Sequence, residues 1–135
     1  MNELEQRTLA RLEKNGFMNY NHIEMEQVER DYAVFRLQVR PENRNVYGMV
    51  HGGAIYTLAD NATGSAAHTD GRNYVTQSGT LHFLRNQREG IIRAQARVRH
   101  RGRSTVLVAV DVVGDDGTLL ASGEFSFFCV DRKPA

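Results

Sequence analysis

One segment limits the folds open to this 135-residue chain more than any other: a long helical pattern at residues 53–68 with strand-like segments on both sides. The apolar residues in this segment that follow helical spacing are Ile55, Leu58, Ala59, Ala62 and Ala66. Most of the other positions hold small side chains, which allow neighbouring backbone to come close. The helix is therefore expected to be apolar around nearly its whole circumference and to be buried.

The segments on either side of this helix have mostly strand character. Strands are expected at residues 22–29, 32–40, 74–84, 91–99, 104–113 and 119–130, with the last four in hairpin succession. Asp116-Gly117 is a strong hairpin signal between the last two strands. A short helix is expected at residues 3–15, because Asn15-Gly16 is a common helix stop. Residues 41–50 have no periodicity and are expected to form a loop.

This order of elements predicts an α+β fold. Strands and helices do not alternate regularly, which argues against a parallel, doubly wound sheet. One helix can cover a sheet of this size only if the sheet curls around it. We therefore expect a curved antiparallel β-sheet wrapped around a long central helix, and the length predicts a single domain over residues 1–135.

Composition excludes several classes of protein. The net charge of +1 gives no general case for nucleic-acid binding, and no apolar run is long enough for a membrane helix. The N-terminal residues lack the apolar core of a signal peptide. Cys129 is the only cysteine, and no His/Cys cluster indicates a metal site. A cytoplasmic protein without nucleic-acid, membrane or metal partners is expected.

The chemistry is concentrated in residues 45–60. A loop leads to His51, two glycines follow, and the helix begins. Backbone N–H groups at a helix start lack acceptors, and the helix dipole adds positive charge there. Gly52 and Gly53 would let a thioester carbonyl approach these groups, which would stabilise a developing oxyanion. Asp60 lies in the same helix, where a carboxylate is costly unless it is paired or used.

Structural explanations exist for each of these residues. The two glycines could serve only as a tight helix start, and His51 could be a helix cap or a packed side chain. Asp60 could be an internal hydrogen-bonding residue. The residue pattern alone leaves these alternatives open.

The run from Asn45 through Gly48 and His51-Gly52-Gly53 to Leu58-Ala59-Asp60 resembles the signature of the hotdog-fold thioesterase superfamily. It is most similar to the small acyl-CoA thioesterases of the phenylacetate-pathway type, and the resemblance extends over about residues 20–130. It implies the hotdog fold and hydrolysis of an acyl- or aryl-coenzyme A thioester without a cofactor. Many relatives have proline near the position of Asn86, a departure that would affect a loop.

The resemblance also implies roles for individual residues. Asp60 would be the general base or the nucleophile, and Gly52 or Gly53 would donate a backbone N–H to the thioester carbonyl. Asn45 and His51 would position the carbonyl, the attacking water or the leaving sulfur, and Thr63 would assist Asp60. Sites in this family lie between two subunits, so a homodimer, often paired into a homotetramer, is implied.

Arginines are concentrated in one segment of the C-terminal half of the chain. Seven of them fall between residues 85 and 103, and coenzyme A carries phosphates that guanidinium groups bind well. Arg85, Arg88, Arg101 and Arg103 lie near strand ends, where the mouth of a pocket is expected, and they are the candidates for binding the coenzyme A tail. The other arginines of this group fit a solvated strand face better.

Two other functions remain possible on sequence grounds. A hotdog-fold hydratase or dehydratase also acts on acyl thioesters with a histidine and an acidic residue, but its usual signatures lack this double glycine. A non-enzymatic acyl-CoA-binding module would not need a buried carboxylate such as Asp60. The sequence does not identify the acyl group.

Overall fold

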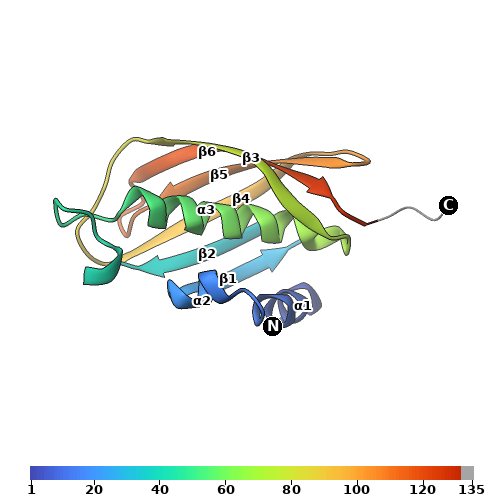
Figure 1. The fold of residues 1–135 in the computed structure, drawn as a ribbon, viewed down its shortest axis with the longest axis horizontal. Coiled ribbons are helices and arrows are strands. Elements are labelled where there is room, and N and C mark those ends of the chain that lie inside the picture. Colours follow the sequence, from blue (N-terminus) through green and yellow to red (C-terminus); the bar gives the residue numbers. More distant parts are fainter. Residues whose placement is uncertain (132–135) are drawn as a thin grey trace.

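The computed structural model describes residues 1–131, and in it a six-stranded antiparallel sheet wraps around the helix α3 (Figure 1). The helices are α1 (Glu3–Leu12), α2 (Gly16–Tyr20) and α3 (Gly52–Ala67), with short 3-10 turns η1 (Pro41–Asn43) and η2 (His68–Asp70). The strands are β1 (Ile23–Glu29), β2 (Tyr32–Gln38), β3 (Tyr74–Phe83), β4 (Ile91–Arg101), β5 (Thr105–Val113) and β6 (Leu119–Cys129). None of the helices in this part of the chain is long and apolar enough to cross a membrane.

The predicted α+β architecture is confirmed, with one local difference near the N-terminus. The first helix ends at Leu12, and a second short helix, α2, follows it. The side chain of Asn15 accepts a hydrogen bond of 3.1 Å from the Met18 N–H and caps α2. The Asn15-Gly16 pair therefore begins α2, and the expected helix over residues 3–15 is shorter than predicted, because α1 ends three residues before this pair.

The expected hairpin succession of the last four strands is correct only for β4, β5 and β6. The sheet order is β1-β2-β4-β5-β6-β3, so β3 pairs with β6 and β4 pairs with β2. The reason is the position of α3 between β2 and β3. This helix carries the chain across the concave face of the sheet, so that β3 begins at the edge far from β2 (Figure 1). The strands β4, β5 and β6, which come later in the sequence, lie between β2 and β3.

The helix α3 is buried on one side only. Its fully buried residues are Ile55, Leu58, Ala59, Ala62, Thr63, Ser65, Ala66 and Ala67. They face the sheet, whose core side chains include Phe35, Val108 and Phe125. On the opposite side Tyr56 is exposed and Asp60 is half-buried. The expectation of burial around the whole circumference is therefore wrong for a single chain, because the polar residues of α3 gather on an open side.

The two edges of the sheet differ. At the β1 edge, residues of the α1 segment bind the free backbone groups of Val28: the Asn2 side chain donates to its carbonyl at 2.9 Å, and the Glu5 carboxylate accepts from its N–H at 3.1 Å. The β3 edge has a strand partner on one side only. Val75 and Phe83 on β3 are 52% and 53% exposed. A long, uncovered edge strand of this kind readily pairs with another strand.

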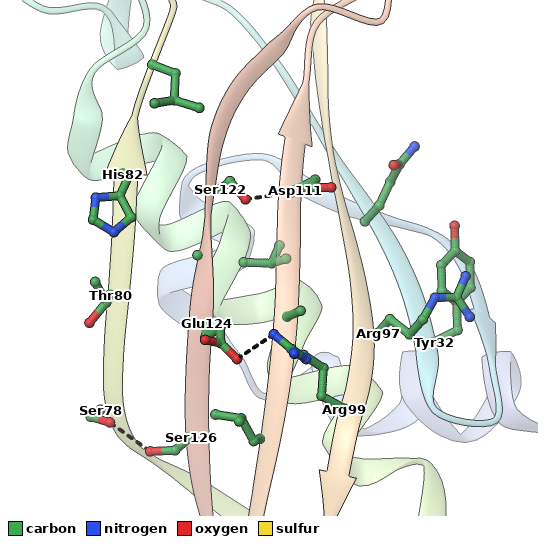
Figure 2. A pocket seen from close by; sticks show the side chains of 16 residues that line it. Tyr32, Ser78, Thr80, His82, Arg97, Arg99, Asp111, Ser122, Glu124 and Ser126 are labelled. Atoms are coloured by element: carbon green, nitrogen blue, oxygen red, sulfur yellow. Dashed lines mark hydrogen bonds and ion pairs between the residues drawn. The ribbon is translucent and has the colours of Figure 1, made fainter.

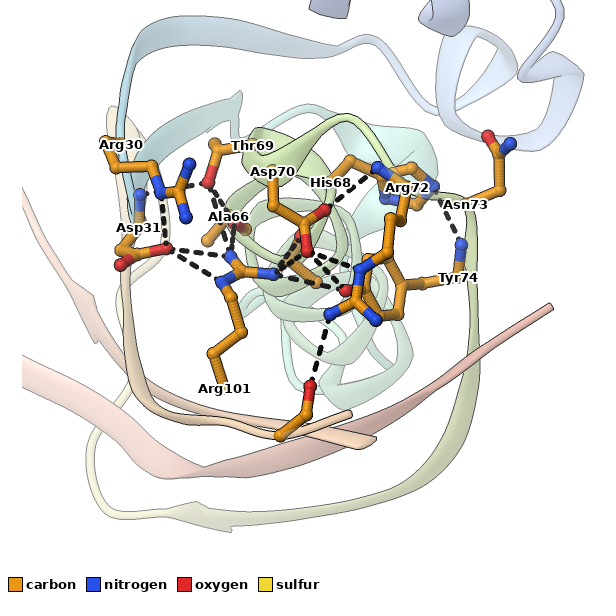
Figure 3. A network of polar contacts seen from close by, with 12 residues as sticks. Arg30, Asp31, Ala66, His68, Thr69, Asp70, Arg72, Asn73, Tyr74 and Arg101 are labelled. Carbon is orange, nitrogen blue, oxygen red and sulfur yellow. Dashed lines mark hydrogen bonds and ion pairs between the residues drawn. The ribbon is translucent and has the colours of Figure 1, made fainter. Parts of the chain in front are cut away.

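Arg101 fastens the C-terminal end of α3 to the sheet (Figure 3). Its Nη1 donates to the carbonyl of Ala67 at 2.8 Å and lies 2.9 Å from Oδ2 of Asp70. Its Nη2 donates to Oδ1 of Asp31 at 2.8 Å. A cation beside the last carbonyls of a helix is favourable, and here only 15% of the side chain is exposed. The arginine therefore joins the β1–β2 turn, the end of α3 and β4.

Asp70 is the second centre of this cluster. It accepts hydrogen bonds from the Tyr74 hydroxyl at 2.6 Å and from Nε of Arg72 at 2.8 Å. Burial alone would raise the pKa of Asp70, but these hydrogen bonds and the nearby Arg101 lower it to about 2. Burial and the contact with Asp70 raise the pKa of Tyr74 to about 12. Since the pKa of Asp70 is lowered on folding, its contribution to stability is present at neutral pH and is lost as the pH falls towards 2.

We predict that Arg101→Gln lowers the free energy of unfolding by about 3 kcal/mol, because it removes the mostly buried cation that joins Asp31, Asp70 and the last carbonyls of α3. Urea denaturation at pH 7 measures this change. Arg97→Gln is the matched control, since Arg97 is exposed and within residues 1–131 makes a cation–π interaction with the ring of Tyr32 but no ion pair. Equal losses in the two variants would contradict a structural role for the Arg101 cluster.

Candidate active site

The candidate site begins in the loop that leads into α3. The Asn45 side chain accepts hydrogen bonds from the N–H groups of Tyr47 at 2.9 Å and Met49 at 3.1 Å. The Asn45 N–H donates to the carbonyl of Met49 at 2.7 Å. Asn45 thus holds the loop in shape immediately before His51. Its suggested role in orienting a substrate carbonyl or a water stays a prediction.

His51 and the two glycines form one unit at the start of α3. Nδ1 of His51 accepts a hydrogen bond of 2.8 Å from the Gly53 N–H, so the ring caps the helix. A Cβ on Gly53 would lie 3.1 Å from this nitrogen, so the missing side chain leaves room for the ring. The Gly52 N–H has no acceptor within residues 1–131. Of the two predicted donors, Gly52 is therefore the one that is free to bind a carbonyl oxygen.

Asp60 lies on the open side of α3 and is held by a residue of β3. Its Oδ1 accepts a hydrogen bond of 2.7 Å from the Thr76 hydroxyl. Burial raises the pKa of Asp60, and the hydrogen bond from Thr76 offsets part of this rise. A carboxyl group whose pKa is raised by partial burial suits proton transfer near neutral pH.

The sequence gives no reason to single out Thr76, because a threonine in a β-branched strand is ordinary. The register of β3 against β6 shifts between Thr76 and Ser78, which marks a bulge at Gln77. Such bulges change the direction of the neighbouring side chain. Only the fold shows that Thr76 meets Asp60.

Thr63 is completely buried one turn beyond Asp60. Its hydroxyl donates to the carbonyl of Ala59 at 2.8 Å and also lies 3.1 Å from the carbonyl of Asp60. These contacts stabilise the helix backbone next to the carboxylate. A direct part for Thr63 in the reaction stays a prediction.

Gly52 and Asp60 do not meet within one chain. Eight residues separate them, which corresponds to about 12 Å along the axis of an α-helix. A thioester carbonyl bound at Gly52 would therefore lie beyond hydrogen-bond distance of the Asp60 carboxylate of the same helix. The single chain provides two parts of a site at two different positions.

The four candidate arginines for coenzyme A fall into two groups rather than one. Arg88 lies near the start of α3, where its Nη1 donates to the carbonyl of Tyr47 at 3.0 Å, and Arg85 lines the same hollow of about 720 Å³. Arg101 and Arg103 lie near the other end of α3, where Arg101 is engaged with Asp31 and Asp70. The expectation that these four arginines lie together at the mouth of one pocket is wrong. Arg85 and Arg88 precede β4 whereas Arg101 is its last residue, so the length of this strand separates the two pairs.

The outer face of the sheet carries a hollow of about 940 Å³, on the side away from α3 (Figure 2). Its walls are mixed: Arg99 pairs with Glu124 at 3.2 Å and Ser78 contacts Ser126 at 2.7 Å, while Leu84, Leu107, Ala109 and Val110 are among the apolar lining residues. Asp60 and Gly52 do not line this surface. The outer hollow is therefore not part of the candidate active site.

The profile of the Thioesterase superfamily matches residues 47–121, more than half of the chain. The chain therefore belongs to the thioesterase superfamily, and it is a thioester hydrolase. It is 29% identical over 100 residues to the acyl-coenzyme A thioesterase PaaI of Escherichia coli K12, which covers 73% of this chain and 71% of that protein. The suggested resemblance to this type of enzyme is confirmed.

Solved structures support the same fold. The E. coli PaaI protein from the phenylacetic acid degradation operon superposes with a TM-score of 0.91 at 24% identity, over 96% of this chain and 95% of that chain. The conserved protein PA5202 of Pseudomonas aeruginosa has a TM-score of 0.82 at 28% identity, over 85% and 94%. A thioesterase from Streptococcus pneumoniae TIGR4, solved with coenzyme A, has a TM-score of 0.77 at 24% identity, over 83% and 91%. The hotdog fold is thus confirmed.

We predict that Asp60→Asn raises the melting temperature at pH 7 by about 3 °C. The pKa of Asp60 is raised on folding, so its stabilising contribution is complete only below the ordinary aspartate pKa and is lost as the pH rises. At pH 7 the charged, partly buried carboxylate therefore destabilises the fold, and a neutral amide that still accepts from Thr76 does not. Thermal unfolding at pH 7 and pH 4 measures the effect, which should shrink at the lower pH.

The matched control is Asp111→Asn, because Asp111 is exposed and accepts a similar hydrogen bond from Ser122 at 2.7 Å. This control should not gain stability. A lower melting temperature for Asp60→Asn at pH 7 would mean that the Asp60 carboxylate contributes to stability rather than opposing it.

Proposed function

We propose that this thioesterase hydrolyses an acyl- or aryl-coenzyme A thioester to the free acid and coenzyme A, with Asp60 as the catalytic carboxylate. The observation that carries the proposal is a half-buried aspartate with a raised pKa on the open side of α3. The same helix presents the free Gly52 N–H at its start. The name of the E. coli relative and the coenzyme A in the S. pneumoniae structure support this class of substrate.

The reaction follows from these two groups. The Gly52 N–H and the helix dipole polarise the thioester carbonyl and stabilise the oxyanion of the tetrahedral intermediate. The Asp60 carboxylate either takes a proton from the water that attacks the carbonyl carbon or attacks that carbon directly. The C–S bond then breaks and coenzyme A leaves as the thiolate, which takes up a proton. If Asp60 has attacked directly, water then hydrolyses the acyl–Asp60 anhydride, which releases the free acid and restores the carboxylate. Thr76 orients the carboxylate, and His51 holds the glycine turn in position.

Structures of the S. pneumoniae thioesterase carrying an Asp→Ala or a Thr→Ala substitution have been solved. The two substituted positions are 16 residues apart in that protein, as Asp60 and Thr76 are here. This equal separation supports a joint role for Asp60 and Thr76.

A homodimer with the site between its subunits is part of the proposal. Phe83 at the end of β3 lies beside Gly52, where a Cβ would be 3.6 Å from its ring, and Thr76 near the start of β3 holds Asp60. If two β3 edges pair in antiparallel fashion about their centres, the Phe83 end of one strand meets the Thr76 end of the other. Gly52 of one subunit then approaches Asp60 of its partner, which overcomes the separation of about 12 Å within one helix.

The open side of α3 and the uncovered β3 edge both support this arrangement, because a second copy would cover them together. Two such dimers meeting through the outer face of the sheet would form the homotetramer. A cytoplasmic location belongs to the same proposal and rests on the single Cys129.

The coenzyme A tail is proposed to bind near Arg85 and Arg88. Both line the hollow beside the start of α3, where the thioester carbonyl is bound in this mechanism. Guanidinium groups bind phosphate oxygens through paired hydrogen bonds. Arg103 is exposed at the other end of α3 and stays a further candidate, reachable only by a tail that crosses between subunits.

We predict that Asp60→Asn lowers kcat by about 10²- to 10⁴-fold with little change in KM, because it removes the base or nucleophile and leaves substrate contacts in place. A panel of acyl- and aryl-coenzyme A thioesters with thiol detection measures the rates. Asp111→Asn should keep wild-type turnover. Release of a hydrated or dehydrated acyl thioester in place of free thiol would favour the hydratase alternative. Full activity of folded Asp60→Asn would exclude Asp60 from the mechanism.

Mixed subunits test the composite site. Gly52→Pro removes the proposed oxyanion donor, since proline has no N–H and is tolerated in the first turn of a helix. We predict that both Gly52→Pro and Asp60→Asn homodimers are inactive. Dimers with one subunit of each kind should regain activity, because one of their two sites receives both intact groups. Activity after unfolding and refolding of equal mixtures, with dimer formation followed by affinity tags, measures this. Mixed dimers that form without activity would contradict a site shared between subunits.

A further inference from the structure

A small cavity of about 180 Å³ lies between α1 and the C-terminal end of α3, and no step of the proposed reaction uses it. Arg7 and Arg11 of α1 line one wall, and His68 and Arg72 line the other. Figure 3 shows His68 and Arg72 at this end of the helix. Because Arg7 and Arg11 are four residues apart, they share one face of α1. The cavity is thus bordered by three guanidinium groups.

Arg11 is the unusual group in this cavity. It is partly buried, and burial lowers the pKa of its guanidinium. Its Nη2 donates to the Ser65 hydroxyl at 2.9 Å, and no carboxylate of residues 1–131 lies within 4.0 Å of it. By contrast, the buried guanidinium of Arg101 has two aspartates. A desolvated cation without a counter-ion is unfavourable, so Arg11 is suited to receive an anion.

The other polar groups near the cavity are already engaged. Nε of Arg72 donates to Asp70 at 2.8 Å, and the Asn73 side chain donates to Asp131 at 2.9 Å. Nδ1 of His68 lies 2.6 Å from the Gly64 carbonyl, and its Nε2 accepts from the Tyr74 N–H at 3.3 Å. Burial and the nearby Arg11 lower the pKa of His68, so the ring forms a neutral wall.

Arg7 and Arg11 are therefore the groups with free donors. Arg7 is exposed, and within residues 1–131 its guanidinium makes no ion pair or hydrogen bond. Both side chains can turn their donor forks towards the same anion. Guanidinium forks match the oxygens of a phosphate group better than they match a halide ion.

The size of the cavity limits the ligand. Its volume corresponds to about six water molecules at roughly 30 Å³ each, well below the range of a typical cofactor pocket. We propose that the cavity binds one phosphate group as a dianion, held by Arg11 and Arg7. The phosphate is either free inorganic phosphate or the end of a longer phosphorylated molecule. This site does not depend on the proposed thioesterase mechanism.

Inorganic phosphate is the first probe. Isothermal titration of the full-length protein at pH 7.5 and constant ionic strength should give saturable binding, and sodium chloride should give none. Arg11→Gln should weaken binding at least tenfold, because it removes charge-assisted hydrogen bonds. Arg7→Gln, an exposed substitution that spares the fold, should weaken it as well. The matched control is Lys14→Gln, which removes one charge just after α1 but does not line the cavity, and it should bind as the wild type does.

The source of the phosphate is identified by competition. Coenzyme A that displaces inorganic phosphate, when 3′-dephospho-coenzyme A does not, would identify the 3′-phosphate of the substrate as the ligand. Independent binding of coenzyme A and phosphate would identify free phosphate. Absence of saturable phosphate binding to the wild type would overturn the proposal. So would equal binding by the wild type, Arg11→Gln and Arg7→Gln, or equal weakening by Lys14→Gln.

Discussion

The burial of α3 against the concave face of the sheet is the contact on which the rest of the structure depends. A single helix must cover the apolar side of six strands, so the sheet curves until its core side chains reach Leu58, Ala59 and Ala62. Small residues on the helix let the strands approach closely. The same contact fixes the start of the helix, where Gly52 lies, and the open side that carries Asp60. Packing and chemistry are thus set by one element.

Much of this arrangement can be predicted from sequence because it is encoded locally. The spacing of apolar residues indicates the helix, and alternation with turn signals indicates the strands. The His51-Gly52-Gly53 run and Asp60 stand out because glycines before an apolar helix and a carboxylate inside it are both unusual there. Their combination resembles a family signature, so the candidate residues could be named before any fold was available.

Other parts could not be predicted because they depend on contacts between distant segments. The pairing of β3 with β6 follows from the path of α3 over the sheet, which no local pattern records. Thr76 meets Asp60 only through this pairing and the bulge beside it. Closeness in sequence suggests that Arg85, Arg88, Arg101 and Arg103 bind one ligand together. In the structure, however, the Arg101 side chain points inwards and pairs with Asp31 and Asp70, which belong to separate elements. The hydrogen-bonding partners of a long side chain depend on the fold, so they cannot be predicted from the residues next to it in sequence.

The unequal edges of the sheet have a consequence for how large an assembly can grow. Asn2 and Glu5 occupy the backbone groups of Val28 that a further strand would need, so strand addition at this part of the β1 edge is hindered. Within residues 1–131, β3 is thus the more open of the two edge strands, and two copies that pair through β3 would use up both of these open edges. In the proposed homodimer, growth by strand pairing would therefore stop at two copies, and a few polar atoms at the opposite edge of the sheet would help to prevent an open-ended fibre.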